Sequence, residues 1–524
     1  MAFVKQIKED YWDDFTINEN DINFIYNHLL EIETPQTTLE ITNAIISNRI
    51  LFEKDAIYSK TQDSGTVYMP MNTYKEGDSL IFSSLDWAKG IVQKVRDGFN
   101  PEFDELKVIQ VAFDDHSTKE YAINIKEHIL NTPIDLIGDN QIFDQEFVFK
   151  NYKEKIFTEV ETTLKNNSEL VRIAGSWFPR ALLVDINVGI LNLVEAVLEE
   201  AKGGPMDTRE LMKHVDMQSD ANQKLLEFSF NLALQEDDRF DEVGPSGEVL
   251  WYLKSAEPEY VKNPPPFLEY KMMRVDREIV QELIAQFEGN VFDELEVNDI
   301  DNLNSEHITI SLIYPHWRSG TLPLSSTLIH LFPTAYEAPR VRFTFVDEKD
   351  KKIFNGWVVR PHQYVYGLKN WYEEKGLIPG SFVTISKSDK PGNIIISSQR
   401  SRQNKEWLKT VLVGADQGIV FALLKQTITA DYNERMAIAI PDVELLDDIW
   451  LKDHGKQKFE SIIRKCIHEL AKLNPQGHIH AQELYATVNI LFRCPPGPIL
   501  EYLLKDKNIK HLGDLYFHFQ DENT

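Results

Sequence analysis

The sequence predicts a multidomain α+β protein. Its 524 residues exceed what one hydrophobic core supports, and helix-type and strand-type patterns alternate in blocks along it. The chain is acidic, with a formal net charge of -28, yet residues 307–409 hold fifteen Lys or Arg against eight Asp or Glu. That segment also has the pattern of short strands. A positive strand-rich module in a negative chain predicts a confined phosphate-binding surface.

The composition fits a globular protein of a reducing compartment, with 42% apolar residues and two cysteines, Cys466 and Cys494. The start, MAFVKQIKEDYWDDF, lacks the apolar core of a signal peptide. The most apolar helical stretch, residues 181–198, is interrupted by Asp185 and Glu195, which favours a buried helix over a membrane span. We therefore expect no membrane partner and a cytoplasmic location, in the nucleoid.

The first half of the chain alternates helices with strands. Two helices are expected within residues 21–54, the second capped by Thr37 or Thr38. Turns at KEGD and RDG and the alternating stretch KVIQVAF then predict a small antiparallel β-barrel. Helices resume over residues 143–201. Further on, the prolines of KNPPPF predict a stiff linker, followed by a helix over residues 276–288.

An internal repeat links two distant segments. GGPMDTREL at 203–211 parallels QGHIHAQEL at 476–484, and both copies end in an aromatic strand, VLWYL in one and LYFHF in the other. The shared order is a short strand, two helices and a hairpin, which is that of a winged helix-turn-helix.

These copies resemble the HARE-type winged helices, a family that includes the acidic delta subunit of bacterial RNA polymerase and proteins associated with chromatin or DNA modification. The first copy offers Asn222, Gln223 and Lys224 to a partner, but Glu227 and the acidic residues 236–238 oppose approach to phosphates. We expect the winged helices to bind protein, with RNA polymerase as a possible partner.

The central run from Thr321 to Ser386 carries a second resemblance. Its features, in order, are a strand ending in Leu-Pro, a charged turn in VRFTFVDEKDKK, a strand bearing Trp357, the helix start GLKNWY and the closing stretch LIPGSFVTI. This order is similar to the DNA-binding pseudobarrel of plant auxin- and abscisic-acid-response factors, and related barrels serve as target-recognition domains of some restriction enzymes. Ser381 departs from the family pattern, which has an acidic residue there.

The complete prediction is a multidomain α+β chain with winged-helix modules, a small antiparallel β-barrel and a seven-stranded-type DNA-binding pseudobarrel. Its expected parts are an N-terminal helix-turn-helix-like segment (1–65), the small barrel (66–140), a helical connector (141–200), winged helix 1 (201–258), a Pro-rich linker with a helix (259–304), the basic pseudobarrel (305–400), a mixed connector (401–455) and winged helix 2 (456–524).

The pseudobarrel resemblance implies that two loops at one end of the barrel grip the major groove of duplex DNA. The first loop, HWRSG, contributes Trp317, Arg318 and Ser319; the second, RPHQY, contributes Arg360, His362, Gln363 and Tyr364. Arg can pair with guanine and Gln with adenine, while Ser and Tyr can reach phosphate. Further phosphate contacts are expected from three nearby cations, Arg340, Arg342 and Lys369.

The sequence offers no catalytic or metal-binding signature. Nucleotide-binding, hydrolase and metalloprotease motifs are missing, so we expect neither an enzyme nor a cofactor. Asp185, Glu200 and Lys202 are nuclease-type residues, but they fall in helical sequence. The potential zinc ligands match no familiar spacing, and Cys466 falls on an apolar helix face, so no metal is expected; these ligands are Cys466, His468, His478, His480 and Cys494.

Three functions remain open. The leading hypothesis is a double-stranded DNA-binding protein associated with transcription or chromatin. The first alternative is an acidic protein-interaction scaffold that does not bind DNA. The second is the DNA-recognition subunit of a restriction or defence system whose nuclease is a separate chain.

Overall fold

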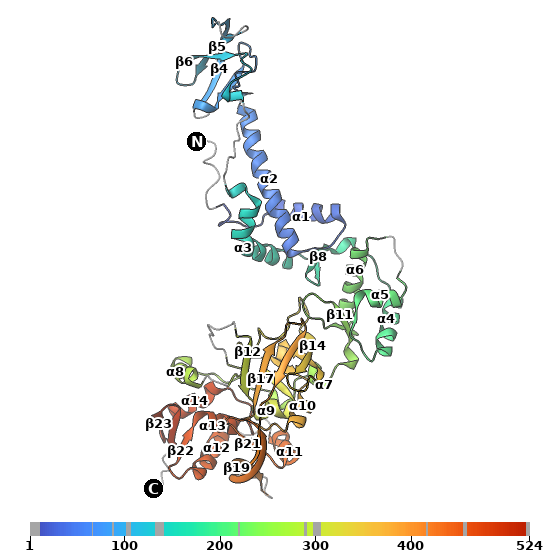
Figure 1. The fold of residues 1–524 in the computed structure, drawn as a ribbon, viewed down its shortest axis with the longest axis vertical. Helices are drawn as coiled ribbons and strands as arrows, with labels where there is room; N and C mark the ends of the chain where they lie inside the picture. The colour runs from blue at the N-terminus through green and yellow to red at the C-terminus, as the bar shows by residue number, and fades with distance from the viewer. Residues whose placement is uncertain are drawn as a thin grey trace. The chain divides into compact units, whose positions relative to one another are not determined.

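The computed structural model describes residues 11–64, 66–85, 88–100, 106–131, 141–217, 221–287, 291–296, 305–414, 418–453 and 458–519 (Figure 1). The chain is a mixed α and β multidomain protein with several separate sheets. It divides into two compact units. Unit 1 comprises Met1–Asp185 with Asp220–Ser229, and unit 2 comprises Ile186–Ser219 with Phe230–Thr524.

Unit 1 contains a strand–helix–helix–hairpin arrangement assembled from two distant segments. The elements are α1 (Glu19–Ile32), β1 (Gln36–Thr37), α2 (Thr38–Ser64), α3 (Gln145–Lys165), β7 (Leu170–Ile173) and β8 (Ser176–Pro179). Strand β8 pairs with both β1 and β7. The buried Trp177 indole donates a hydrogen bond to the Thr38 hydroxyl at 3.0 Å. The expected helical segment 1–65 and part of the expected connector 141–200 are therefore one folded body.

A five-stranded sheet is inserted between α2 and α3. Its strands are β2 (Thr66–Val67), β3 (Ser79–Phe82), β4 (Ala88–Asp97), β5 (Lys107–Phe113) and β6 (Thr118–Ile123), in that spatial order. The predicted strand KVIQVAF is β5, and its buried residues alternate as expected. An aromatic cluster that includes Tyr68, Tyr74 and Phe82 fills the core. The sheet is mostly antiparallel, as predicted, but β2 and β3 run parallel.

Two further copies of the strand–helix–helix–hairpin arrangement lie in unit 2, except that the start of α6, up to Ser229, belongs to unit 1. The first, preceded by α4 (Val188–Glu200), has β9 (Met206–Asp207), α5 (Thr208–His214), α6 (Gln223–Glu236), β10 (Phe240–Glu242) and β11 (Leu250–Leu253). The second, preceded by α12 (Phe459–Leu473), has β22 (His478–His480), α13 (Ala481–Val488), α14 (Pro496–Lys505), β23 (Ile509–Gly513) and β24 (Tyr516–Phe519). These are the two segments that the sequence repeat relates.

All three copies share one strand register. The residue before the helix N-cap pairs with a buried aromatic residue of the hairpin: Gln36 with Trp177, Met206 with Trp251, and Ile479 with Phe517. In each copy the N-cap side chain accepts a backbone N–H from the first turn of the helix: Thr37 from Glu40, Asp207 from Glu210 and His480 from Gln482. His480 is thus the cap that its place in the repeat predicts.

The central module is a curled seven-stranded half-barrel. Its strands are β12 (His307–Ser311), β13 (Thr321–Pro323), β14 (Arg340–Asp347), β15 (Ile353–Val359), β16 (Tyr364–Tyr366), β17 (Phe382–Lys387) and β18 (Asn393–Ser397). The spatial order is β12-β17-β18-β14-β15-β16-β13, with β14 and β18 parallel. Two short helices, α9 (Tyr314–Ser319) and α10 (Lys369–Lys375), follow strands at one end. The interior holds an apolar core that includes Leu322, Phe345, Val365 and Ile385.

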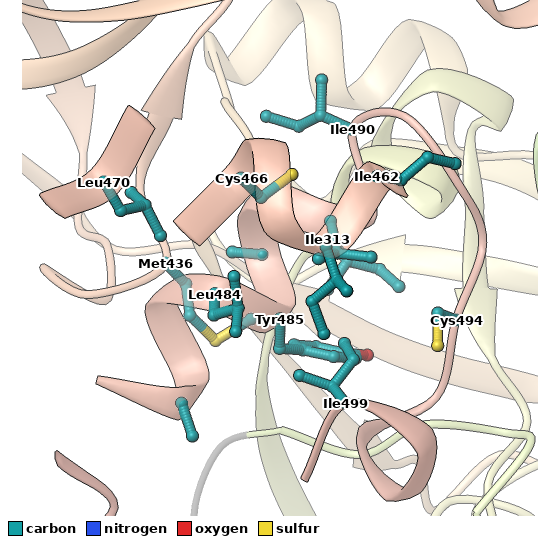
Figure 2. Close-up of a cluster of buried hydrophobic side chains, with 14 of the residues drawn as sticks. Ile313, Met436, Ile462, Cys466, Leu470, Leu484, Tyr485, Ile490, Cys494 and Ile499 are labelled. Atoms are coloured by element: carbon teal, nitrogen blue, oxygen red, sulfur yellow. The ribbon is translucent and has the colours of Figure 1, made fainter. Parts of the chain in front are cut away.

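The rest of unit 2 packs around a second large core. The elements around this core include the helix α8 (Arg277–Phe287), the long hairpin of β19 (Arg400–Val413) with β20 (Ile419–Ala430), β21 (Ile438–Ala439) and α11 (Val443–Asp453). The short helix α7 (Glu259–Lys262) instead packs against Trp357, Val359 and Tyr364 of the half-barrel through Val261. The predicted helix over 276–288 corresponds to α8. Figure 2 shows residues of α12, α13 and α14 meeting Ile313 and Met436, with Cys466 inside as expected from its apolar face. Among the described helices, none has both the length and the apolar character needed to cross a membrane.

Candidate nucleic-acid interface

The strand register places the two predicted DNA-gripping loops at opposite ends of the half-barrel. Thr321 of β13 pairs with Tyr366 of β16, and Pro323 pairs with Tyr364. Because the two strands are antiparallel, HWRSG, which precedes β13, lies at the end where β16 finishes, and RPHQY lies where β16 begins. We call these ends the Arg318 rim and the His362 rim. The expectation that both loops share one end is wrong for this geometry.

The Arg318 rim packs against α11. The Arg318 guanidinium forms an ion pair with Asp447, with Nε 2.9 Å from Oδ2. The Trp317 indole donates to the carbonyl oxygen of Leu377 at 2.7 Å, and Ser319 is buried. The Lys369 ammonium lies over the Trp317 ring, and burial, followed by the charge of Arg318, lowers its pKa. These four residues, which were predicted to contact DNA, therefore take part in packing within unit 2.

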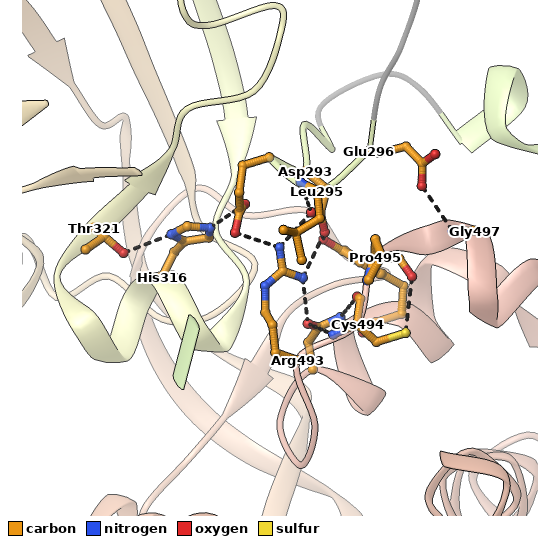
Figure 3. A network of polar contacts seen from close by, with 12 residues as sticks. Asp293, Leu295, Glu296, His316, Thr321, Arg493, Cys494, Pro495 and Gly497 are labelled. Carbon is orange, nitrogen blue, oxygen red and sulfur yellow. Dashed lines mark hydrogen bonds and ion pairs between the residues drawn. The ribbon is translucent and has the colours of Figure 1, made fainter. Parts of the chain in front are cut away.

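A buried ionic network fixes the same end of the half-barrel to the strand–helix–helix–hairpin copy of β22 to β24 (Figure 3). Arg493, which is 1% exposed, donates to Asp293 at 2.6 Å and to Glu294 at 2.8 Å. His316 of α9 lies 2.9 Å from the other Glu294 oxygen. Burial alone would raise the pKa of Glu294, but Arg493 and His316 hold it well below its usual range.

The outer face of β14, β15 and β16 is covered by the strand–helix–helix–hairpin copy of β9 to β11 and the segment after it. The backbone N–H of Arg342 donates to the carbonyl oxygen of Val243 at 2.8 Å. The Arg340 guanidinium donates to Asp241 at 2.8 Å, and the Tyr364 hydroxyl donates to the carbonyl oxygen of Tyr260 at 2.7 Å. Burial lowers the pKa of Arg342. Three more predicted DNA contacts thus lie in an interface inside the chain.

Three predicted residues remain at the His362 rim. His362 and Gln363 are exposed, and Arg360 is partly exposed while donating to the carbonyl oxygen of Pro333 at 2.9 Å. The His362 ring stacks on Tyr364, with ring centroids 6.2 Å apart. Gln363 has a φ of 54°, in the left-handed region, and ends the short helical turn Arg360–His362.

The register brings two lysines to this rim that the sequence did not single out. β17 ends at Lys387 and β18 begins at Asn393, so the turn between them lies at the same end as β16's start. Lys387 and Lys390 are exposed there, accompanied by the exposed Asp389. The turn sequence SDKPG signals a hairpin, but only the strand order shows at which end of the half-barrel it lies. β18 begins level with Thr344, four residues into β14, so the turn is offset along the sheet from the start of β16.

Two further kinds of chemistry, metal binding and thiolate chemistry, concern the described Cys, His, Asp and Glu residues. Within the described ranges, no three His, Cys, Asp or Glu side chains lie together as a metal site requires. Burial raises the pKa of Cys466 to about 12 and that of Cys494 well above its usual value, which disfavours thiolate chemistry. Comparison of the chain with protein-family models, curated proteins and solved structures gave no match.

Proposed function

We propose that the chain binds double-stranded DNA through the His362 rim, in a role associated with transcription or chromatin. The supporting observation is that two turns bring Arg360, His362, Gln363, Lys387 and Lys390 to one end of the half-barrel. Arg and Lys suit phosphate oxygens, and a Gln amide can pair with adenine in the major groove. The contact is small, because the remainder of a chain with net charge -28 repels DNA.

A test exchanges charge at the two rims of the half-barrel. The double variant Lys387→Glu, Lys390→Glu should weaken duplex binding by tenfold or more, since each lysine removed loses a phosphate contact of roughly 1 kcal/mol or more. The matched control is Lys349→Glu, Lys351→Glu, which changes the same charge in the exposed β14–β15 turn at the Arg318 end. Fluorescence anisotropy of a labelled duplex with the full chain measures both.

Salt provides a second readout of the same contact. With about three cations at the rim, the logarithm of the binding constant should fall with the logarithm of salt concentration with a slope of roughly -2 to -3. Equal weakening by both double variants would indicate a non-specific charge effect. Undetectable binding by the unmodified chain at low salt would remove the proposal.

The acidic protein-interaction scaffold is the second candidate. It is favoured by the internal pairing of the predicted DNA contacts: Arg318 with Asp447, Arg340 with Asp241, and Tyr364 with the Tyr260 carbonyl oxygen. A cation already paired with a carboxylate gains little from a phosphate. On this reading the winged-helix copies bind proteins and the half-barrel holds them together. A chain that retains no duplex DNA yet co-purifies with RNA polymerase would favour the scaffold.

A further inference from the structure

A buried carboxyl lies where the first winged-helix copy docks on the half-barrel. Glu257, just after the short helix Lys254–Ala256, is 3% exposed. Its nearest cation in an ion pair is Arg340 of β14, with Nη1 3.6 Å from Oε2. The same Nη1 lies 2.8 Å from Asp241 of β10. Among the described residues, no group donates a hydrogen bond to either Glu257 oxygen.

This arrangement disfavours an ionised Glu257. A buried carboxylate needs donors or a dedicated cation, but the Arg340 guanidinium is already closer to Asp241. Burial and the adjoining Asp241 together raise the pKa of Glu257 to about 8, although the charges of Arg340 and Lys254 oppose the rise. In the protonated form Glu257 can donate its proton to the Asp241 carboxylate, leaving one net charge for Arg340 to balance.

Other charged groups at this interface take different partners. Glu242 of β10 accepts the N–H of Gly244 at 3.0 Å, and burial raises its pKa to about 8 as well, with contributions from Glu337 and Asp241. The phenol of Tyr364 on β16 donates to a backbone carbonyl oxygen. Glu257 is thus the carboxyl that competes with Asp241 for Arg340.

We propose that Glu257 is a proton-dependent latch that holds the first winged-helix copy on the half-barrel. Protonated, it shares its proton with Asp241 and the two parts stay docked. When it releases that proton to bulk water, two buried carboxylates compete for one guanidinium and docking weakens. Undocking would free Arg340 and Arg342 on the outer strand face for another anionic partner. The inference does not depend on DNA binding.

The direction of the pH dependence follows from linkage. The docked state keeps a proton on Glu257 up to about pH 8, whereas an exposed Glu loses it near pH 4.3. Between these values the docked state binds more protons, so docking weakens as pH rises, by at most about tenfold per pH unit for this one group. Above pH 8 the contribution of Glu257 is constant.

Hydrogen exchange of the full chain between pH 5 and 9 tests the latch. The amide of Arg342, bonded to the Val243 carbonyl oxygen across the interface, is the reporter. After division by the intrinsic exchange rate at each pH, opening at this amide should increase with pH. Glu257→Gln, which mimics the neutral acid, should reduce that slope by up to about tenfold per pH unit. The exposed control Glu248→Gln should leave it unchanged.

The double variant Glu242→Gln, Glu257→Gln removes both carboxyls whose pKa is raised, so the opening of the Arg342 amide should no longer depend on pH. Its difference from the single variant Glu257→Gln gives the contribution of Glu242. An unmodified chain whose corrected opening does not change between pH 5 and 8 overturns the latch, whether or not the variants fold. So does a Glu257→Gln chain with the full slope of the unmodified protein.

Discussion

Arg493 brings its guanidinium into a fully buried site, where Asp293, Glu294 and the Asn489 side chain accept its hydrogen bonds. The two acidic residues come from a segment about two hundred positions earlier in the chain. Inside a protein such a set of charges is tolerated only when all of them are present, since each ion has lost its water. This network therefore joins the strand–helix–helix–hairpin copy of β22 to β24 and the end of the half-barrel into one body.

Replacing Arg493 with Met should destabilise unit 2 strongly. The change leaves Asp293 and Glu294 buried without their main cation, and breaking a buried pair in this way typically costs about 3–5 kcal/mol. Arg464→Met is the matched control, because the Arg464 side chain is exposed and, within the described residues, bonds to the Tyr502 and Asp506 side chains. The thermal unfolding midpoint of the full chain measures both, and equal midpoints would show that the network contributes no stability.

Among the elements, the strand–helix–helix–hairpin arrangement recurs three times, whereas the sequence revealed two copies. The pair at 203–211 and 476–484 was detectable because both carry Gly, a polar cap and Glu-Leu at matching positions. The first copy escaped detection because the sheet between α2 and α3 separates its helices, and local patterns carry no information on which segments meet. Trp177 and Gln36 pair only in the folded chain.

The inability of local patterns to show which segments meet also explains why only some of the predicted site residues lie together. Residue chemistry pointed to His362 and Gln363, which are exposed, and to Arg360, which is partly exposed, on one rim of the half-barrel. It also pointed to Arg318 and Arg340, whose carboxylate partners lie about a hundred positions away in sequence. A sequence pattern cannot distinguish a free arginine from one that is paired across such a distance, whereas β5 and α8 follow from local periodicity alone.

Thr38 offers a test of the first copy. Its hydroxyl accepts the hydrogen bond of the buried Trp177 indole, so Thr38→Val should leave that N–H unsatisfied and cost unit 1 about 1–3 kcal/mol. Thr158→Val on the exposed face of α3 is the control and should change stability by about 0.5 kcal/mol or less. Urea unfolding followed by Trp fluorescence compares them. Equal midpoints would contradict the assigned role of the Trp177–Thr38 bond.

At the scale of the whole molecule, the acidic composition and the carboxyl groups with a lowered pKa together determine how the protein responds to acid. Burial disfavours ionisation of Asp347, but Lys375, Trp371 and the backbone N–H groups of Lys349 and Asp350 lower its pKa to about 2. The folded pKa lies below the unfolded value of about 3.9. Asp347 therefore stabilises the half-barrel above pH 4, and that contribution disappears as pH falls towards 2.

Acid should consequently unfold unit 2 in part through this residue. Between pH 5 and pH 2 the free energy of unfolding should fall by about 2 kcal/mol more in the unmodified chain than in Asp347→Asn. The exposed Asp389→Asn is the control and should follow the unmodified chain. Urea titrations at each pH give the comparison. An Asp347→Asn chain with the full acid sensitivity would show that other carboxyls account for the loss.

The insertion of the five-stranded sheet has a consequence for synthesis on the ribosome. Strand β1 cannot complete its pairing until β8 has emerged, long after the intervening strands β2 to β6. The nascent chain must therefore hold α2 without its hairpin while the inserted sheet, whose own aromatic core is local in sequence, can already fold. During that interval the apolar side chains of α2 remain exposed. They form the stretch of this polypeptide that a chaperone would recognise.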